Sequence, residues 1–406
     1  MLASVASMID QFNMHNIRML LKMGYEVSVA CNFYVGNTCD TTQMKKLLKT
    51  LRDMHVPYYQ WDCPRSIVPV GKCFCAYRQL MKLTRRHSFG WIHCHSPVGS
   101  AIARLVAHKR KIRVIYTAHG FHFYKGAPKK NWMLYYPAEK LLSAWTDVLV
   151  TVNQEDYRFA RRNLRIKDIY RISGVGIDTE RFEMKVIKKC SLRRKYDIPD
   201  DAILLLSVGE LSRRKNHQAV LDAMALLSRS DIYYLVCGLG QCEKELQKRA
   251  KELGIGERFR LAGYQEDVSE YYQNADIFVF PSKQEGLPVA LMEAMAAGLP
   301  CIVSDIRGNR ELIDTDFAQA DRIKDGMHGG IRFSLKYPEQ LSVALARMAE
   351  NEILRRMCGR YNREKIKGYD RKVVDRQMHG IYKKSMTKYV MEGDKYAGNI
   401  GNYVGL

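Results

Sequence analysis

Short apolar segments alternate with longer helical stretches along this chain of 406 residues, and this alternation constrains its fold most strongly. Strands rich in Val, Ile and Leu with helices between them are typical of parallel sheets covered on both faces. The expected strands of the first half are 2–7, 26–31, 91–95, 113–118 and 147–152, with helices at 41–54, 72–86 and 130–145. The second half repeats the pattern, with strands at 202–209, 232–238, 258–264, 276–282 and 301–305. Two such series predict an α/β chain of two doubly wound domains.

The boundary between the two domains is expected near SGVGIDTERF (173–182), where glycines interrupt both patterns. We therefore predict a first domain over 1–172 and a second over 173–390, with the last helix able to pack back on the first domain. Residues 391–406 lack periodicity and are expected to form a flexible tail. Ligands of doubly wound sheets bind at the carboxyl ends of the strands, so the segments that follow strands are the places to search for a site.

The formal net charge of +22 is distributed unevenly along the chain. Residues 1–172 hold 27 Lys and Arg against 10 Asp and Glu, whereas the remainder holds 38 against 33. A positive first half favours an anionic partner: a nucleic acid, an acidic membrane face or a phosphorylated acceptor. No common nucleic-acid-binding motif occurs, so no nucleic-acid partner is expected.

The sequence also indicates a cytoplasmic protein. It contains no run of about 18 apolar residues that would predict a transmembrane helix, and no signal-peptide pattern. Its eleven cysteines are scattered and form no CxxC pair, which favours reduced thiols in a cytoplasmic setting.

The segment KQEGLPVALMEAMAAGLPCIVSD (283–305) places two glutamates among apolar residues. Pro288 suits the first turn of a helix and Gly298 the position after its end, so 288–297 is predicted as a short buried helix. Glu293 lies inside that helix, and a buried carboxylate without partners is costly. It is either a structural residue bonded to a backbone N–H or an arginine, or part of a functional site.

The residues that precede the same helix predict a ligand site. Glu285 is either a partner of the helix dipole or a ligand-binding carboxylate. The free N–H groups around Gly286, Leu287 and Pro288 would meet a phosphate, while the two carboxylates accept hydroxyl hydrogens from a polyol. A nucleotide-sugar has both parts.

Two further strand ends carry candidate phosphate-binding groups. In GELSRRKNH (209–217), Arg213, Arg214 and Lys215 could clamp a diphosphate, or they could form a solvated loop. In GLGQCEKEL (238–246), Gly238 and Gly240 allow a phosphate to approach the backbone, or they form a tight turn. The third glycine of a dinucleotide fingerprint is absent, which disfavours a nicotinamide cofactor.

The segment YTAHGFHFYKGAPKKNWMLYYP (116–137) combines histidines, aromatic residues and lysines. His119 follows a strand and is a candidate for hydrogen bonding or acid–base work. The aromatics and lysines suit a sugar-binding wall or a membrane-facing surface. His93 and His95 share one strand face, but no carboxylate or cysteine lies at a familiar zinc spacing, so no metal site is expected.

SKQEGLPVALMEAMAAGLPCIVSDIRGNREL resembles the donor-site motif of the family-4 retaining glycosyltransferases of the GT-B fold: a glutamate, seven residues and a second glutamate. IYTAHGFHFYKGAP, NWMLYYPAEK, SGVGIDTERF and SVGELSRRKNH resemble the branch that builds capsular and exopolysaccharide repeat units. The similarity extends to about residue 390. It implies two Rossmann-like domains whose parallel sheets face an interdomain cleft.

The resemblance also implies roles for individual residues. Glu293 would bind the ribose of the nucleotide, and Glu285 would face the transferred sugar. Lys215 matches the lysine that binds the donor diphosphate. His119 matches the histidine at the sugar end of the site, and Tyr264 would lie near the base. No metal is needed in such enzymes, because basic side chains and helix termini stabilise the leaving nucleoside diphosphate.

One departure from the family pattern concerns the charge near the diphosphate. The family usually has an arginine after the glycine of the 209–215 motif, and here that position is Glu210. Arg213 and Arg214 are the candidates to supply the charge that Glu210 lacks.

The sequence thus predicts a hexosyl- or N-acetylhexosaminyltransferase that moves a sugar from a nucleotide donor, a UDP-sugar, to a lipid-pyrophosphate-linked glycan. It would be cytoplasmic and peripherally bound to the anionic inner leaflet of the membrane. Two alternatives remain open at this stage: a nucleotide-sugar epimerase of the same architecture, and a non-catalytic nucleotide-binding protein.

Overall fold

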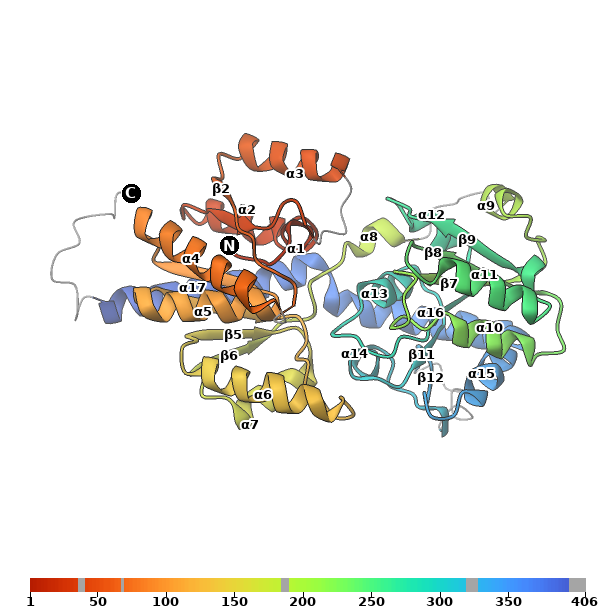
Figure 1. The fold of residues 1–406 in the computed structure, drawn as a ribbon. Helices are drawn as coiled ribbons and strands as arrows, with labels where there is room; N and C mark the ends of the chain where they lie inside the picture. Colours follow the sequence, from red (N-terminus) through yellow and green to blue (C-terminus); the bar gives the residue numbers. More distant parts are fainter. Residues whose placement is uncertain (36–40, 67–68, 184–189, 319–327, 394–406) are drawn as a thin grey trace. The chain divides into compact units, whose positions relative to one another are not determined.

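The computed structural model describes residues 1–35, 41–66, 69–183, 190–318 and 328–393, and the chain divides into two compact units (Figure 1). The first unit comprises Met1–Ile172 and Lys372–Leu406, and the second comprises Ser173–Arg371. Helix α17 (Arg371–Gly393) therefore belongs almost wholly to the first unit. The flexible tail expected over 391–406 lies outside the described residues from 394 onward.

The first unit is built on parallel strands. Strands β3 to β6 pair in sequence order, β1 pairs with β2, and Leu2 joins the two groups through parallel bridges to Ala30 and Cys94. The strands are β1 (Val29–Cys31), β2 (Tyr58–Gln60), β3 (Trp91–His95), β4 (Arg113–Ala118), β5 (Val148–Thr151) and β6 (Asp168–Arg171). The helices are α1 (Ala6–Phe12), α2 (Met14–Lys22), α3 (Thr41–Asp53), α4 (Val70–Arg86), α5 (Pro97–Arg110), α6 (Lys129–Ser143) and α7 (Gln154–Asn163).

The strand expected over 2–7 is wrong beyond its first residues. Leu2 pairs as a strand residue would, but the chain turns into α1 at Ala6, whose N–H donates to the Asn32 carbonyl at 3.1 Å. A short apolar run fits a buried strand and a buried helix equally well, so periodicity alone does not separate them.

Helix α17 is attached to this sheet through a buried histidine. His93 Nδ1 lies 2.8 Å from the Tyr382 hydroxyl, and its Nε2 lies 2.8 Å from the Thr117 hydroxyl. Burial holds the pKa of His93 well below its usual value, so the ring is neutral and both nitrogens are satisfied by hydroxyls. This histidine therefore has a structural role.

We expect Tyr382→Phe to lower the free energy of unfolding by about 1–2 kcal/mol, because it leaves the buried Nδ1 of His93 without its partner. Denaturant titration of the purified variant would measure this change. Tyr337→Phe, at an exposed tyrosine, is the matched control. An unchanged free energy for Tyr382→Phe would contradict the anchoring role.

The second unit contains one six-stranded parallel sheet in the order β12-β11-β10-β7-β8-β9. Its strands are β7 (Ile203–Val208), β8 (Ile232–Cys237), β9 (Phe259–Gly263), β10 (Ile277–Phe280), β11 (Cys301–Ser304) and β12 (Gly330–Phe333). Its α-helices are α8 (Thr179–Phe182), α9 (Cys190–Lys195), α10 (Gln218–Ala225), α11 (Glu243–Glu252), α12 (Ser269–Asn274), α13 (Val289–Ala296), α14 (Arg307–Leu312), α15 (Glu339–Glu350) and α16 (Glu352–Ile366).

The side chains of successive residues in these strands point to opposite faces of the sheet, because the backbone is pleated. Leu205, Ile277 and Val279 belong to a core that also contains side chains of α10, α11 and α15. Phe278, which lies between Ile277 and Val279 in β10, instead contacts Tyr272 of α12, with the two ring centres 5.7 Å apart. The sheet is therefore buried on both faces, which is why its strands read as continuous apolar runs.

Two chemical features accompany this fold. Within the described ranges, none of the helices combines the length and the apolar character that a membrane span requires. The cysteines whose side chains the structure describes are free thiols.

Candidate functional site

The carboxyl ends of β7 and β10, which are neighbours in the second sheet, bring three of the predicted residues together. Asn216 adopts the left-handed conformation at φ 60°, which asparagine tolerates, and its side-chain amide donates to the Pro281 carbonyl at 3.2 Å. The Lys283 N–H donates to the Arg214 carbonyl at 2.8 Å. These bonds fasten the loop after β7 to the loop after β10, so the basic run lies beside Glu285.

Glu285, Arg214 and Lys215 form one charged cluster. Glu285 Oε1 lies 2.7 Å from Arg214 Nη1 and 2.9 Å from Lys215 Nζ. The side chains of Lys215 and Glu285 are only 13% and 12% exposed. Lys215 Nζ also lies 4.7 Å from the centre of the Phe280 ring, a cation–π contact. Two cations around one carboxylate leave an excess positive charge in a poorly hydrated place, which suits an anionic ligand.

Arg213 and Arg214 were the candidates to supply the positive charge that is missing at Glu210, and they differ in their contacts. Arg214 contacts Glu285, whereas Arg213 is 82% exposed and lies 3.8 Å from Glu245 of α11. Of the two, Arg214 is therefore the one placed beside the proposed diphosphate position. The donor-binding role of either residue stays a prediction.

Gly240 lies where two strand-end loops pack tightly. A Cβ at this position would stand 2.3 Å from the Leu211 carbonyl oxygen, so a larger residue would force the loops apart. Leu211 N–H also donates to the Leu239 carbonyl at 2.9 Å, and Cys242 N–H donates to the Leu211 carbonyl at 3.0 Å. Loop packing thus accounts for this glycine, while its proposed contact with phosphate stays a prediction.

The helix predicted over 288–297 is α13, which begins at Val289 with Pro288 as its N-cap. Pro288 itself carries no N–H. Donors at this helix start can come only from Gly286, Leu287 and the first turn of α13. The Gly286 carbonyl packs against Gly308 of α14, where an added Cβ would lie 2.5 Å from it.

Glu293 lies within α13 and is partly buried. The Tyr272 hydroxyl lies 3.0 Å from both Glu293 Oε2 and the Ala290 carbonyl. Burial raises the pKa of Glu293 to about 7, although Tyr272 and the positive charge of Arg181 act in the opposite direction. In the described part of the chain it forms no ion pair, so the carboxylate retains capacity for a hydroxyl donor.

His119 belongs to the first unit, at the end of β4. Its Nε2 lies 3.1 Å from His95 Nδ1, so one of the two rings donates a hydrogen bond to the other. Burial lowers the pKa of His119 to about 4, and the ring is therefore neutral. Among the described residues no cluster of three or more His, Cys, Asp or Glu could hold a metal ion.

Tyr264 follows β9 at the edge of the sheet and is half exposed, away from the ion cluster on β7 and β10. Two aromatic residues were missed by sequence reasoning. Tyr272 is the partner of Glu293, and Phe280 supports Lys215. Phe280 ends the apolar run of β10 and looks like an ordinary core residue, while Tyr272 lies in the SEYYQN of α12, far from Glu293 in the sequence, so no sequence signal distinguished them.

The sequence of this chain is similar to two family models and to the sequences of known proteins. Residues 12–181 match the family model described as Glycosyltransferase Family 4, and residues 189–365 match that of Glycosyl transferases group 1. EpsD of Bacillus subtilis (strain 168) is named as a glycosyltransferase. It is 36% identical to this chain over 321 residues, and the match covers 74% of this chain and 77% of EpsD. The UDP-Gal:alpha-D-GlcNAc-diphosphoundecaprenol alpha-1,3-galactosyltransferase of Escherichia coli is 26% identical over 300 residues, 72% of this chain and 74% of that enzyme.

Solved structures share the fold at low sequence identity. Anabaena Alr3699/HepE in complex with UDP and glucose superposes with a TM-score of 0.74 at 14% identity, covering 94% of this chain and 98% of that one. WaaG, described as a glycosyltransferase involved in lipopolysaccharide biosynthesis, gives a TM-score of 0.67 at 17% identity, covering 94% and 99%.

Proposed function

This chain belongs to glycosyltransferase family 4 and has the GT-B fold, and on that premise we propose that it transfers a sugar, with retention of configuration, from a UDP-sugar to a lipid-pyrophosphate-linked glycan. The donor would be a hexosyl or N-acetylhexosaminyl nucleotide, and the product a precursor of an exopolysaccharide or capsule. The enzyme would work in the cytoplasm at the inner face of the membrane.

The ion cluster of Arg214, Lys215 and Glu285 is the observation that carries this proposal. Its two cations would bind the donor diphosphate and stabilise the negative charge that develops on the leaving nucleoside diphosphate. Because side chains carry that charge, we propose that transfer needs no metal ion. Glu285, which pairs with both cations, would then face the transferred sugar.

We propose a role for each of the remaining predicted residues. Glu293 would accept hydrogen bonds from the ribose hydroxyls, with the Tyr272 hydroxyl fixing its second oxygen. The N–H groups of Gly286 and Leu287 at the start of α13 would meet the diphosphate. Neutral His119 would contact hydroxyls of the transferred sugar.

Relatives support the choice of substrates. The name of the Escherichia coli relative specifies UDP-Gal as donor and a diphosphoundecaprenol-linked GlcNAc as acceptor, and solved structures of the same fold hold UDP. The excess of basic residues in 1–172 suits a partner that is anionic, as a lipid pyrophosphate and an anionic leaflet both are.

The proposal is tested by screening nucleotide-sugars for protection against thermal unfolding, followed by incubation of each hit with a polyprenyl-diphosphate-linked sugar. We expect a UDP-sugar to raise Tm, since a ligand that binds only the folded chain stabilises it. We further expect a glycosylated lipid whose new linkage keeps the donor's anomeric configuration, with a rate unaffected by EDTA. Epimerised donor without acceptor, an inverted linkage or loss of activity in EDTA would each contradict part of the proposal.

A further inference from the structure

Helix α6 (Lys129–Ser143) turns an apolar stripe outward from the first unit. Met133, Leu134 and Leu141 are 80%, 52% and 61% exposed, and Pro137, between them, is exposed as well. Positions 133, 137 and 141 are each four residues apart, so these side chains share one face of the helix. An outward apolar stripe of this kind indicates a binding surface rather than part of the core.

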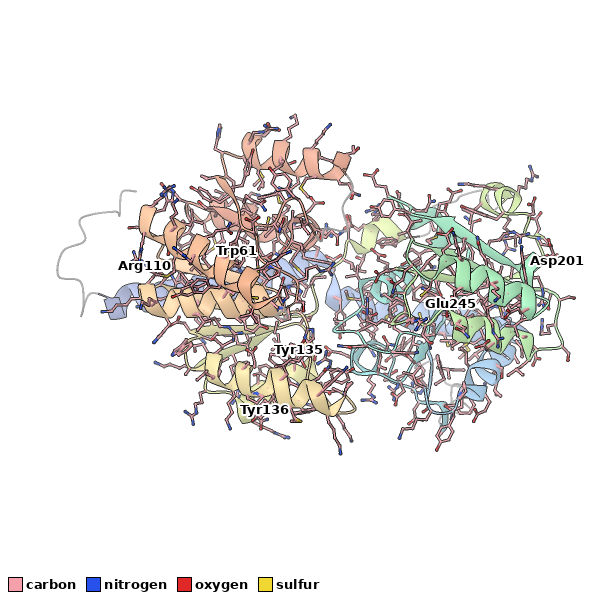
Figure 2. All side chains as sticks on the ribbon, in the orientation of Figure 1. Trp61, Arg110, Tyr135, Tyr136, Asp201 and Glu245 are labelled. Carbon is pink, nitrogen blue, oxygen red and sulfur yellow. The ribbon has the colours of Figure 1, made fainter. Side chains whose placement is uncertain are left out.

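The opposite face of α6 is fixed in place, so the stripe cannot turn inward. Trp132 and Tyr136 pack on Phe159 of α7, with ring centres 5.8 and 5.6 Å apart (Figure 2 labels Tyr136). Glu139 is buried and forms a bidentate ion pair with Arg104 of α5, with N–O distances of 2.6 and 3.1 Å. Helices α6 and α7 are therefore one packed layer, which Figure 1 shows at the edge of the first unit.

The exposed charged side chains of the segment that contains the stripe are uniformly basic. Between residues 119 and 167 all exposed charged side chains are cations, and the acids of this segment are buried or partly buried. The exposed cations are Lys125, Lys129, Lys130, Lys140, Arg158, Arg161, Arg162, Arg165 and Lys167. The burial of Glu139 beneath the helix removes the one negative charge that α6 would otherwise present.

We propose that the stripe Met133–Leu134–Pro137–Leu141, with the basic rim formed by Lys129, Lys130 and Lys140 of the same helix, docks on an anionic lipid surface. Aliphatic side chains on one helix face, flanked by lysines, are the pattern of a helix that lies in the membrane interface. The lysines complement anionic headgroups, and each adds to the attraction. A two-fold contact between two copies would instead bring this basic rim against itself, and like charges oppose that arrangement.

The docking surface deepens the proposed function and takes its biological meaning from it. Helix α6 directly follows the segment that carries His119, so docking would hold this part of the first unit at the membrane that contains a lipid-linked acceptor. Vesicle binding itself does not depend on catalysis, so the two proposals can fail separately.

The test is co-sedimentation of the full chain with vesicles of phosphatidylcholine, with and without phosphatidylglycerol. We expect binding to the anionic vesicles that weakens with added salt. The triple variant Met133→Ser, Leu134→Ser, Leu141→Ser and the triple variant Lys129→Gln, Lys130→Gln, Lys140→Gln should each weaken it about tenfold or more. Matched controls in the second unit are Leu226→Ser, Val343→Ser, Ile353→Ser and Lys244→Gln, Lys248→Gln, Lys251→Gln, all at exposed positions.

Each outcome decides for or against the docking surface. Loss of binding in the α6 variants, with binding kept in the controls, supports it even if no sugar transfer is ever found. Equal binding by the α6 variants and controls, or no binding by the wild-type chain, overturns it. Dimers that the serine variants dissociate, without vesicle binding, would assign the face to a second copy instead. If transfer occurs, the α6 variants should slow it on vesicle-embedded acceptor and leave it unchanged on detergent-dissolved acceptor.

Discussion

Lys215→Ala is expected to lower the kcat of sugar transfer about a hundredfold, which corresponds to about 2.7 kcal/mol of lost transition-state stabilisation. The Lys215 ammonium is largely removed from water, pairs with Glu285 at 2.9 Å and rests on the Phe280 ring. A cation held in so poorly hydrated a place acts strongly on charge that develops in the leaving diphosphate. Steady-state kinetics with the UDP-sugar found by the ligand screen would measure the loss.

Controls in the same unit separate a missing charge from a damaged fold. Lys215→Arg keeps the charge and should recover part of the rate, whereas Lys248→Ala, at an exposed lysine of α11, should leave kcat unchanged. Arg214→Ala should cost more than Arg213→Ala, because only Arg214 contacts Glu285. A Lys215→Ala enzyme with wild-type kcat would exclude Lys215 from the donor site.

A double-mutant cycle would show whether the cluster acts as a unit. Glu285→Gln removes the carboxylate that pairs with both cations. The effects of Glu285→Gln and Lys215→Ala on kcat should therefore be far from additive. Additive losses would mean that the two residues act on the donor independently, which their direct ion pair argues against.

The sequence predicted the central strands and the edge strand β9, but missed three other strands. Strands such as β4 and β11 are buried on both faces, so their apolar runs are continuous and conspicuous. The three strands that were missed, β2, β6 and β12, all lie at sheet edges. They are short, and each carries a polar residue (YYQ in β2, DIYR in β6 and GIRF in β12), so none of them forms a continuous apolar run in the sequence.

The site shows a similar limit. The spacing of Glu285 and Glu293 and the basic run 213–215 identified the charged groups, since each follows or opens a regular element. The sequence did not reveal which arginine would meet Glu285, because that depends on the left-handed turn at Asn216 and its bond to Pro281. Nor did it reveal Tyr272 as the partner of Glu293, since the two residues lie on different helices.

Glu293→Gln is expected to change how stability depends on pH. Burial raises the pKa of Glu293 from 4.5 to about 7, so the folded chain retains a proton that the unfolded chain releases. Between these two values the folded state binds more protons, and the free energy of unfolding therefore falls as pH rises. The loss reaches on the order of 3 kcal/mol above pH 7 and is absent below the unfolded pKa. The glutamine variant has no such loss, so its stability relative to wild type should increase from pH 5 to pH 8 in denaturant titrations.

Ionisation of Glu293 lowers the stability of the folded chain, but it should strengthen the binding of a nucleoside. Ribose hydroxyls donate to a carboxylate better than to a carboxylic acid, so the affinity of the wild-type chain for uridine should rise as pH passes through about 7. Uridine is the suitable probe because it has no phosphate to titrate in this range. Calorimetry across pH 6 to 8 should show this increase in wild type and a flat, weaker binding in Glu293→Gln. A variant that binds uridine as wild type does at every pH would leave Glu293 as a structural residue bonded to Tyr272, with no part in holding the donor.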